Sequence, residues 1–289
     1  MKIQPADVKR VIADEDDFGH EMRVGHIFES LVYPDQFNTT FVEAPQHGGT
    51  YTDAITGKPR QFDYRCKILA DGTHRTTIGK CALLAVECKN LHPSSPLVLC
   101  GRPRTSAEAY HTFIASNYDP MGMPNTPHMR RADGTLSLFP PDEFVGKSLL
   151  RMRFANGQLK TDVQPDIYDR WSQALASAVE MASDARFFAP QYKTRDYFSL
   201  VLPIVVVPDG TLWAAEYNSD GTISKDPVQV DTCEFFVERE IGLVPTFKFT
   251  ITHIQFMTLK GFADLLSSFL SGRRKWDRVF PAGSVQVKI

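Results

Sequence analysis

The sequence predicts an α/β domain in which a mixed central β-sheet is flanked by helices, and three observations support this class. Apolar runs of strand length recur along the chain, the longest of them at 200–207. Two segments, 15–33 and 166–186, instead repeat apolar residues at spacings of three and four, as amphipathic helices do. The 289 residues are 43% hydrophobic and 23% charged, which predicts a packed core. We therefore expect a single domain over 1–289.

The other elements follow in order from apolar patterns and turn signals. Pro34 ends the first helix, Asp71-Gly72 marks a turn, and Ser106 is a candidate N-cap. The segment 45–59 is rich in Gly, Pro and His and is predicted to be a loop. The predicted strands are 37–44, 62–70, 77–90, 96–100, 197–208, 211–217, 235–239 and 246–255, and further helices are predicted at 106–116 and 261–271. The uninterrupted apolar strand 197–208 should be central and covered on both faces.

The segment 117–165 is predicted to be an irregular insertion, because six prolines and several glycines interrupt any period. It could act as a lid or a docking segment, or be a plain surface excursion. It also contains several apolar residues: Met121, Met123, Met129, Leu136, Leu138 and Phe139. Such residues are either folded back on the domain or covered by another protein. We favour the second arrangement, as a homo-oligomer or a complex with a different partner protein.

Composition restricts the cellular setting. The apolar runs are shorter than the roughly 20 residues that a membrane span needs, and the N-terminus lacks the apolar segment of a signal peptide. We therefore expect a cytoplasmic protein that does not enter the membrane. The five cysteines are an odd number without a Cys-x-x-Cys pair, which favours buried free thiols over a zinc site. The net charge of −2 leaves any nucleic-acid contact to local patches.

A pattern of two acidic residues and a lysine is the main functional signal. Glu87-Cys88-Lys89 ends an apolar run, and Asp63 lies in the preceding predicted strand. Because side chains alternate along a strand, Glu87 and Lys89 should project together, and Val86 and Cys88 should face the other way. Two carboxylates on neighbouring strands could bind a hard divalent cation, with an ammonium group beside them.

Register decides whether this site exists. If the two strands pair antiparallel with Asp63 opposite Glu87, the carboxylates meet. A tighter turn places Asp63 opposite Leu83, and a bulge or sheet twist is then needed to close the gap. A slip by one residue sends Asp63 to the other face of the sheet and destroys the site.

Glu-x-Lys by itself is common on half-exposed strands. Three further features favour a site here: the run before Glu87 is almost entirely apolar, an acidic residue lies on the preceding strand, and a helix with acidic residues comes before both. A charge at the end of a buried strand needs a partner or a metal.

The pattern over residues 15–100 resembles the PD-(D/E)XK nuclease superfamily, which has a restriction-endonuclease-like core. The helix at 166–186 and the strand at 197–208 agree with that core in order. In place of the family's proline, Phe62 precedes the first acidic residue, a change that the family tolerates.

The resemblance implies that Asp63, Glu87 and the carbonyl of Cys88 bind Mg²⁺, for which Mn²⁺ could substitute, and that Lys89 assists catalysis. It also implies a helix glutamate at the metal site, for which Glu29 is the candidate and Glu21 and Glu15 are weaker ones. Gln173 is a weak candidate for a further site residue.

The resulting hypothesis is a metal-dependent phosphodiesterase that acts on DNA, as a bacterial or phage-defence effector that works with a partner. Candidate nucleic-acid contacts are Arg102, Arg104, Asn90 and His92, and further basic clusters are Arg130 with Arg131 and Arg273-Arg274-Lys275. The chain lacks a phosphate-binding loop for ATP, a zinc-protease helix and a serine-hydrolase elbow. The alternative is a non-catalytic nucleic-acid-binding or assembly module on the same fold.

Overall fold

The computed structural model is α/β, with a large mixed sheet and few helices. It describes residues 3–9, 17–31, 40–53, 57–70, 79–117, 127–155, 157–161, 167–185, 196–244, 247–271 and 273–287. The labelled helices are α2 (Asp17–Ser30), α3 (Ile167–Ala185), α4 (Leu259–Leu270) and α5 (Arg273–Val279), and Gly134–Leu136 forms a 3-10 turn. The strands are β1 (Thr40–Val42), β2 (Gln46–Thr52), β3 (Pro59–Ala70), β4 (Gly79–Cys88), β5 (Leu97–Pro103), β6 (Tyr110–Asn117), β7 (His128–Asp133), β8 (Phe144–Ala155), β9 (Gln158–Thr161), β10 (Asp196–Val207), β11 (Leu212–Glu216), β12 (Val228–Gln229), β13 (Thr232–Val244), β14 (Phe247–Thr258) and β15 (Val285–Gln286).

The sheet runs in the order β1-β3-β4-β10-β14-β13-β8-β5-β11-β12. β3 pairs antiparallel with β4, whereas β10 pairs parallel with both β4 and β14. The parallel strands β4, β10 and β14 therefore end at the same edge of the sheet. This arrangement places the end of β4, with Glu87, next to the end of the central strand β10.

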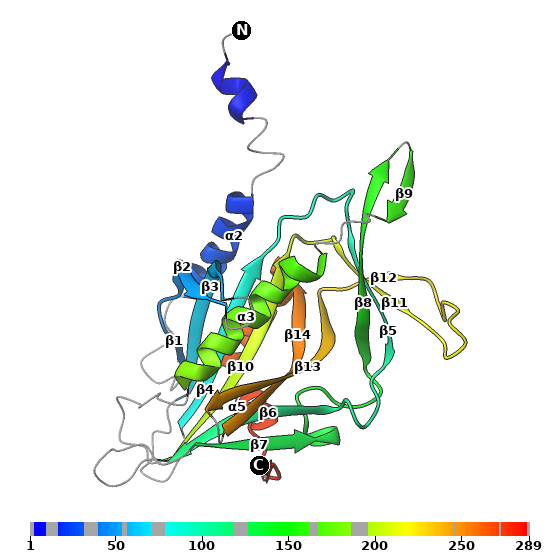
Figure 1. Cartoon of the computed structure of the whole chain (residues 1–289). Coiled ribbons are helices and arrows are strands. Elements are labelled where there is room, and N and C mark those ends of the chain that lie inside the picture. Colours follow the sequence, from blue (N-terminus) through cyan, green and yellow to red (C-terminus); the bar gives the residue numbers. More distant parts are fainter. Residues whose placement is uncertain are drawn as a thin grey trace.

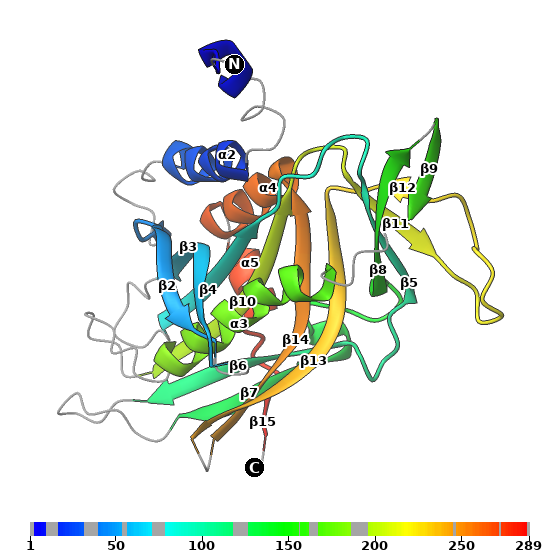
Figure 2. The same cartoon turned by 45° about the horizontal axis from the view of Figure 1, so that its top comes forward.

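Helices cover both faces of the central strands (Figures 1 and 2). α3 packs on one face, where it contributes Ala178 and Ala182 to an apolar cluster with Leu83 and Val201. α2, α4 and α5 lie on the other face, in a cluster that includes Phe28, Phe262 and Trp276. Alternate residues of β4 and β10 enter the two clusters, so the prediction of a central strand covered on both faces is confirmed.

Much of the predicted secondary structure is confirmed. Helices form where apolar residues recur at spacings of three and four, in α2, α3 and α4. The continuous apolar run forms β10, and the strands expected around Asp63 and Glu87 form β3 and β4. The five cysteines are free thiols, as expected.

Two local predictions are wrong. The segment 106–116 is not a helix, because residues from Tyr110 onward form β6, whose β-branched and aromatic side chains outweigh the capping signal of Ser106. The segment 45–59 is not a loop throughout, because residues 46–52 form β2. Its glycines are tolerated there, and Gly48 adopts a positive φ of 71° that favours glycine.

The segment 117–165 is not an irregular insertion where the structure describes it. It contains β7, β8 and β9, and β8 pairs with β5 and β13 in the main sheet. Pro140 and Pro141 lie between strands, so they do not interrupt pairing. Met129, Leu138 and Phe139 are buried in the protein's own core, and the argument that they need a partner protein is thereby removed. Met121 and Met123 lie outside the described residues.

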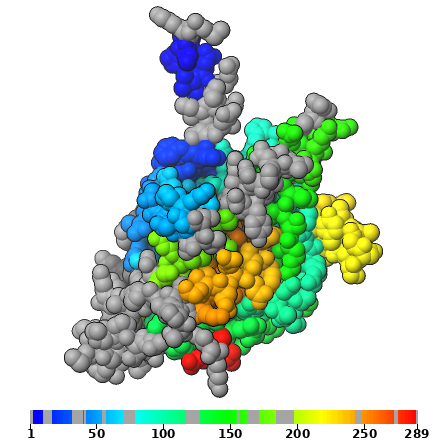
Figure 3. Space-filling model, in the orientation of Figure 1, coloured from blue at the N-terminus to red at the C-terminus, as the bar shows by residue number. Residues whose placement is uncertain are grey.

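The β8–β9 hairpin projects from the body of the molecule, and so does the segment between β11 and β12, which is yellow in Figure 3. Phe154 and Leu159 pair across the hairpin and are exposed. Among the described residues, no helix is both long and apolar enough to span a membrane.

Arg104 is not available for nucleic acid, because its side chain is fully buried. Its Nε donates to Nε2 of His253 at 3.2 Å, and a second nitrogen donates to the carbonyl of Pro140 at 2.6 Å. Burial lowers the pKa of His253 to about 2, and the Arg104 guanidinium lowers it further. His253 therefore stays neutral and accepts a hydrogen bond from the buried Arg104 guanidinium.

This arrangement predicts a pH dependence of folding. The His253 side chain of the unfolded chain takes up a proton near pH 6.5, while that of the folded chain stays neutral. Stability from this group is thus fully present above pH 6.5 and falls as the pH decreases below it. From pH 7.0 to 5.5 we expect it to contribute a loss of about 1 kcal/mol to the free energy of unfolding.

Urea unfolding at both pH values measures this effect. The pH dependence should be weaker by that amount in His253→Gln, whose amide oxygen can still accept from Arg104. The matched control is His26→Gln, which makes the same substitution at an exposed side chain. An unchanged pH dependence in His253→Gln would contradict the assignment.

Candidate functional site

The register of β3 and β4 brings the two predicted carboxylates to the same place. Tyr64 pairs with Val86 at the last recorded position of the ladder, so the next residues, Asp63 and Glu87, follow in the register that joins them. Neither the bulged register nor the one-residue slip occurs between these strands. The main chain thus satisfies the geometric condition for a site shared by Asp63 and Glu87.

Asp63 binds the main chain at the end of β4. Its Oδ2 accepts a hydrogen bond from the backbone N–H of Cys88 at 2.6 Å. In a strand, the N–H and the C=O of one residue point to the same edge. The carbonyl of Cys88 is therefore directed toward β3 and Asp63, while its thiol side chain is buried in the α2 and α4 cluster.

Glu87 and Lys89 project together, as predicted, toward α3. Lys89 Nζ donates to Glu87 Oε1, and it lies 3.4 Å from Oε1 of Gln173 on α3. The side chain of Glu87 is 4% exposed and that of Lys89 is 19% exposed. Gln173 thus lies beside the Glu-x-Lys pair, although its position in the sequence gave only a weak indication of this.

Asp63, Glu87 and Lys89 form a partly buried group that carries more negative than positive charge. Burial raises the pKa of Glu87 to about 7; Lys89 opposes the shift and Asp63 adds to it. Burial also raises the pKa of Asp63, against the hydrogen bond from Cys88. Burial alone would lower the pKa of Lys89, but the Glu87 carboxylate outweighs it and the pKa is raised. The single Lys89 ammonium therefore favours the ionised forms of both neighbouring carboxylates.

Glu29, the predicted helix carboxylate, does not lie beside Asp63 and Glu87. Its side chain is 77% exposed and faces His26 at 3.7 Å. Glu21 and Asp17 instead act on the pKa of Asp63, and Glu21 also acts on that of Glu87. The physical reason is helical geometry, because eight residues separate Glu21 from Glu29 and carry the two about 12 Å apart along the axis of α2. Glu15 lies outside the described residues.

Tyr51 is a site residue that the sequence did not indicate. It lies on β2, is 4% exposed, and its hydroxyl donates to the backbone carbonyl of Gln173 at 3.2 Å. Burial raises its pKa to about 12, and the Glu87 carboxylate adds to the shift. In the sequence, the alternation of Gly49 and Tyr51 with polar residues indicates a strand here. The Gly, Pro and His content of the segment 45–59, which is typical of a loop, obscures that pattern.

The predicted nucleic-acid contacts are separated in the structure. Asn90 and His92 follow directly on Lys89, and His92 is exposed and bonded to Ser94 Oγ at 2.6 Å. Arg102, on β5, is half-exposed and pairs with Glu108 at 3.2 Å. In the other basic clusters, Arg130 donates to the carbonyl of Ser284 and Arg131 pairs with Asp133, whereas Lys275 is half-buried and its Nζ lies 5.5 Å from the ring centre of Phe269.

The oxygen donors at the end of β4 fit a hard cation in kind. They comprise the Asp63 and Glu87 carboxylates and the Cys88 carbonyl, and the raised pKa values show that added positive charge would stabilise the ionised forms. Among the described residues, no group of three or more His, Cys, Asp or Glu side chains is arranged to hold a metal ion. A cation here would be coordinated by two carboxylates, a main-chain carbonyl oxygen and water.

No family model matches the sequence, and comparisons with curated proteins and with solved structures find no similar protein.

Proposed function

We propose that the protein is a metal-dependent nuclease that hydrolyses phosphodiester bonds, with DNA as its substrate. The observation on which this depends is the convergence of Asp63, Glu87 and Lys89 at the end of β4, in the register that the two strands adopt. Buried carboxylates with raised pKa values beside a single lysine are common at functional sites.

The order of elements supports the same proposal. α2, β3, β4, α3 and β10 follow one another along the chain, β3 is antiparallel to β4, and β10 is parallel to β4. This succession agrees with a restriction-endonuclease-like core. The strands from β5 to β9 would then be an elaboration between β4 and α3 that extends the sheet.

Each site residue has a role in this proposal. Asp63, Glu87 and the carbonyl of Cys88 would hold Mg²⁺ or Mn²⁺, with Glu21 contributing charge from α2. The cation would lower the pKa of a bound water and polarise a phosphoryl oxygen. Lys89 would turn from Glu87 to the scissile phosphate, where its ammonium orients the attacking water and stabilises the charge that develops. Gln173 and Tyr51 fix the Lys89 side of the site.

The substrate would approach the end of β4, where Asn90 and His92 follow Lys89. The net charge of −2 and the pairing of Arg102 with Glu108 leave little positive charge for duplex binding. We therefore propose that the nuclease works with a partner protein, which supplies affinity for DNA. A bacterial or phage-defence effector in the cytoplasm is the setting that fits it.

The second candidate function is a non-catalytic binding or assembly module. The ion pair between Glu87 and Lys89 favours it, because it occupies the two groups that a cation and a phosphate would need.

Incubation of the full-length protein with supercoiled plasmid tests the proposal. We expect cleavage with Mg²⁺ or Mn²⁺ and none when EDTA removes the metal, because two buried carboxylates need a cation to act on phosphate. Absence of cleavage with either metal, together with a gel shift of the same DNA, would support the binding module instead.

A further inference from the structure

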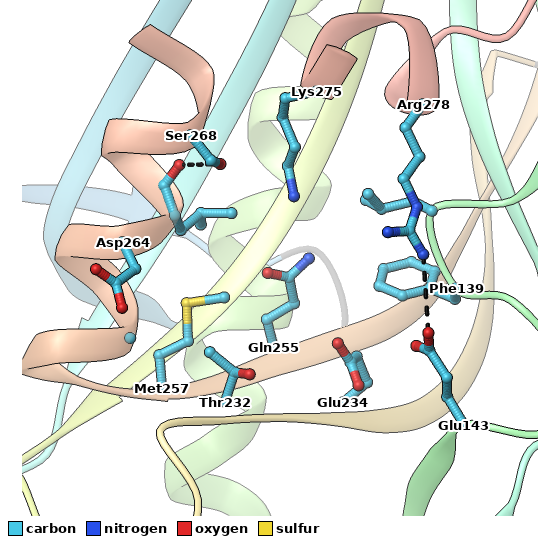
Figure 4. A pocket seen from close by; sticks show the side chains of 13 residues that line it. Phe139, Glu143, Thr232, Glu234, Gln255, Met257, Asp264, Ser268, Lys275 and Arg278 are labelled. Atoms are coloured by element: carbon cyan, nitrogen blue, oxygen red, sulfur yellow. Dashed lines mark hydrogen bonds and ion pairs between the residues drawn. The ribbon is translucent and has the colours of Figure 1, made fainter. Parts of the chain in front are cut away.

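A pocket of about 280 Å³ lies on the opposite face of the sheet from Glu87 and Lys89. Its floor comes from β13 and β14, and α4 and α5 form its walls (Figure 4). Met257 on β14 belongs to the apolar cluster on this face, whereas α3 and the candidate nuclease site lie on the other. The pocket is thus a separate feature of the molecule.

Two cations enter the pocket from one helix. Lys275 and Arg278 lie three residues apart on α5, on the same side of the helix, and both side chains point toward the floor in Figure 4. Arg278 is paired only loosely with Glu143, at 3.9 Å. Lys275 forms no ion pair with another described residue, and its Nζ lies 5.5 Å from the ring centre of Phe269. Burial and the Arg278 guanidinium lower the pKa of Lys275, and the Glu234 carboxylate only partly opposes them, so a further anion in this place would stabilise the ammonium.

The floor offers hydrogen-bonding groups without protein partners. Gln255 is 4% exposed and lines the pocket, and its side-chain amide makes no hydrogen bond to another described residue. Its amide lies opposite the ammonium of Lys275 in Figure 4. Because this amide lines the pocket and has no partner among the described residues, it is placed to bond a molecule that enters there.

Carboxylates complete the lining. Glu234 lies 3.6 Å from the buried guanidinium of Arg104, and Asp264 on α4 forms no ion pair with another described residue. These acceptors suit hydroxyl donors. Cations on one wall and acceptors on the floor and on the other wall define a ligand with an anionic end and a hydroxylated body.

We propose that this pocket binds a small phosphate monoester that also bears hydroxyl groups. The phosphate would lie between Lys275 and Arg278, because two positive charges match the double negative charge of a phosphate better than the single negative charge of a carboxylate. The hydroxyl groups would donate to Glu234 and Asp264, and Gln255 would bond either part. The volume is close to the lower end of the range for small-molecule sites, about 300–1,000 Å³.

Calorimetric titration of the full-length protein with ribose 5-phosphate tests this assignment. We expect saturable binding of one molecule per chain with a Kd below about 1 mM. Inorganic phosphate should bind more weakly because it lacks the hydroxylated body, and ribose and gluconate should bind at least ten-fold more weakly because they lack a dianion. No saturable binding of ribose 5-phosphate would overturn the proposal, and equal affinity for gluconate would overturn its phosphate assignment.

Two substitutions and a wild-type measurement locate the site. Lys275→Met and Gln255→Leu should each weaken binding at least ten-fold, whereas Lys248→Met, which removes a half-exposed lysine of β14, should leave it unchanged. In protein labelled at its methionine methyl groups, the resonance of Met257 should shift on addition of ribose 5-phosphate, and that of Met181 on α3 should not. The methyl spectrum needs no variant, so it decides the matter even if a substitution prevents folding. Binding without a shift of Met257 would place the ligand elsewhere.

Discussion

Replacing Lys89 with alanine should lower the rate of Mg²⁺-dependent plasmid cleavage by about 10²–10³-fold, the usual loss when one stabilising donor is removed. Lys89 is the only ammonium that acts on both Asp63 and Glu87 in the described part of the site. The fold should persist, because burial already raises the pKa of Glu87 to about 7, and the carboxyl can take up a proton when its partner is lost. Initial cleavage rates and far-ultraviolet circular dichroism measure the two effects.

The matched control for this variant is Lys80→Ala on the same strand. Lys80 lies at the other end of β4, where it pairs with Asp277 at 3.2 Å on the surface. Its loss should leave cleavage near the wild-type rate, because an exposed ion pair contributes little to stability and this one lies away from the site. A folded Lys89→Ala protein that cleaves as fast as wild type would remove Lys89 from the proposed mechanism.

The substitution Val86→Asp should unfold the protein. Val86 is 2% exposed, pairs with Tyr64 on one side and Ile204 on the other, and belongs to the cluster beneath α2 and α4. A carboxylate in this place would have neither water nor a cation. We expect a loss of at least about 4 kcal/mol in the free energy of unfolding, a large part of the 5–15 kcal/mol that is usual for a domain.

Urea denaturation measures the loss, and Val228→Asp provides the comparison. Val228 is 48% exposed on β12, so the same chemical change there should alter stability by less than about 0.5 kcal/mol. Cooperative unfolding of Val86→Asp at the wild-type midpoint would show that β4 is not the buried strand described above.

Particular residues show how far sequence alone could lead. Alternation along β4 correctly separated Glu87 and Lys89 from Val86 and Cys88, because a strand directs successive side chains to opposite faces. The spacing of apolar residues likewise predicted α2 and α3. The predicted helix at 106–116 is absent because the capping signal of Ser106 is local, whereas the β-branched and aromatic residues of β6 favour a strand that pairs with β7 and β10.

The sequence by itself determined the α/β class, the long helices, the central strand and the common face of Glu87 and Lys89, because these depend on periods within one segment. The tertiary structure alone decided which distant segments meet. It placed Glu21 rather than Glu29 near Asp63, brought Tyr51 to Gln173, and buried Arg104 against His253. It also built strands from the proline-containing segment between 117 and 165. These outcomes depend on sheet order and on the rotation of a helix about its axis, which are set by packing between elements rather than by any pattern within one of them.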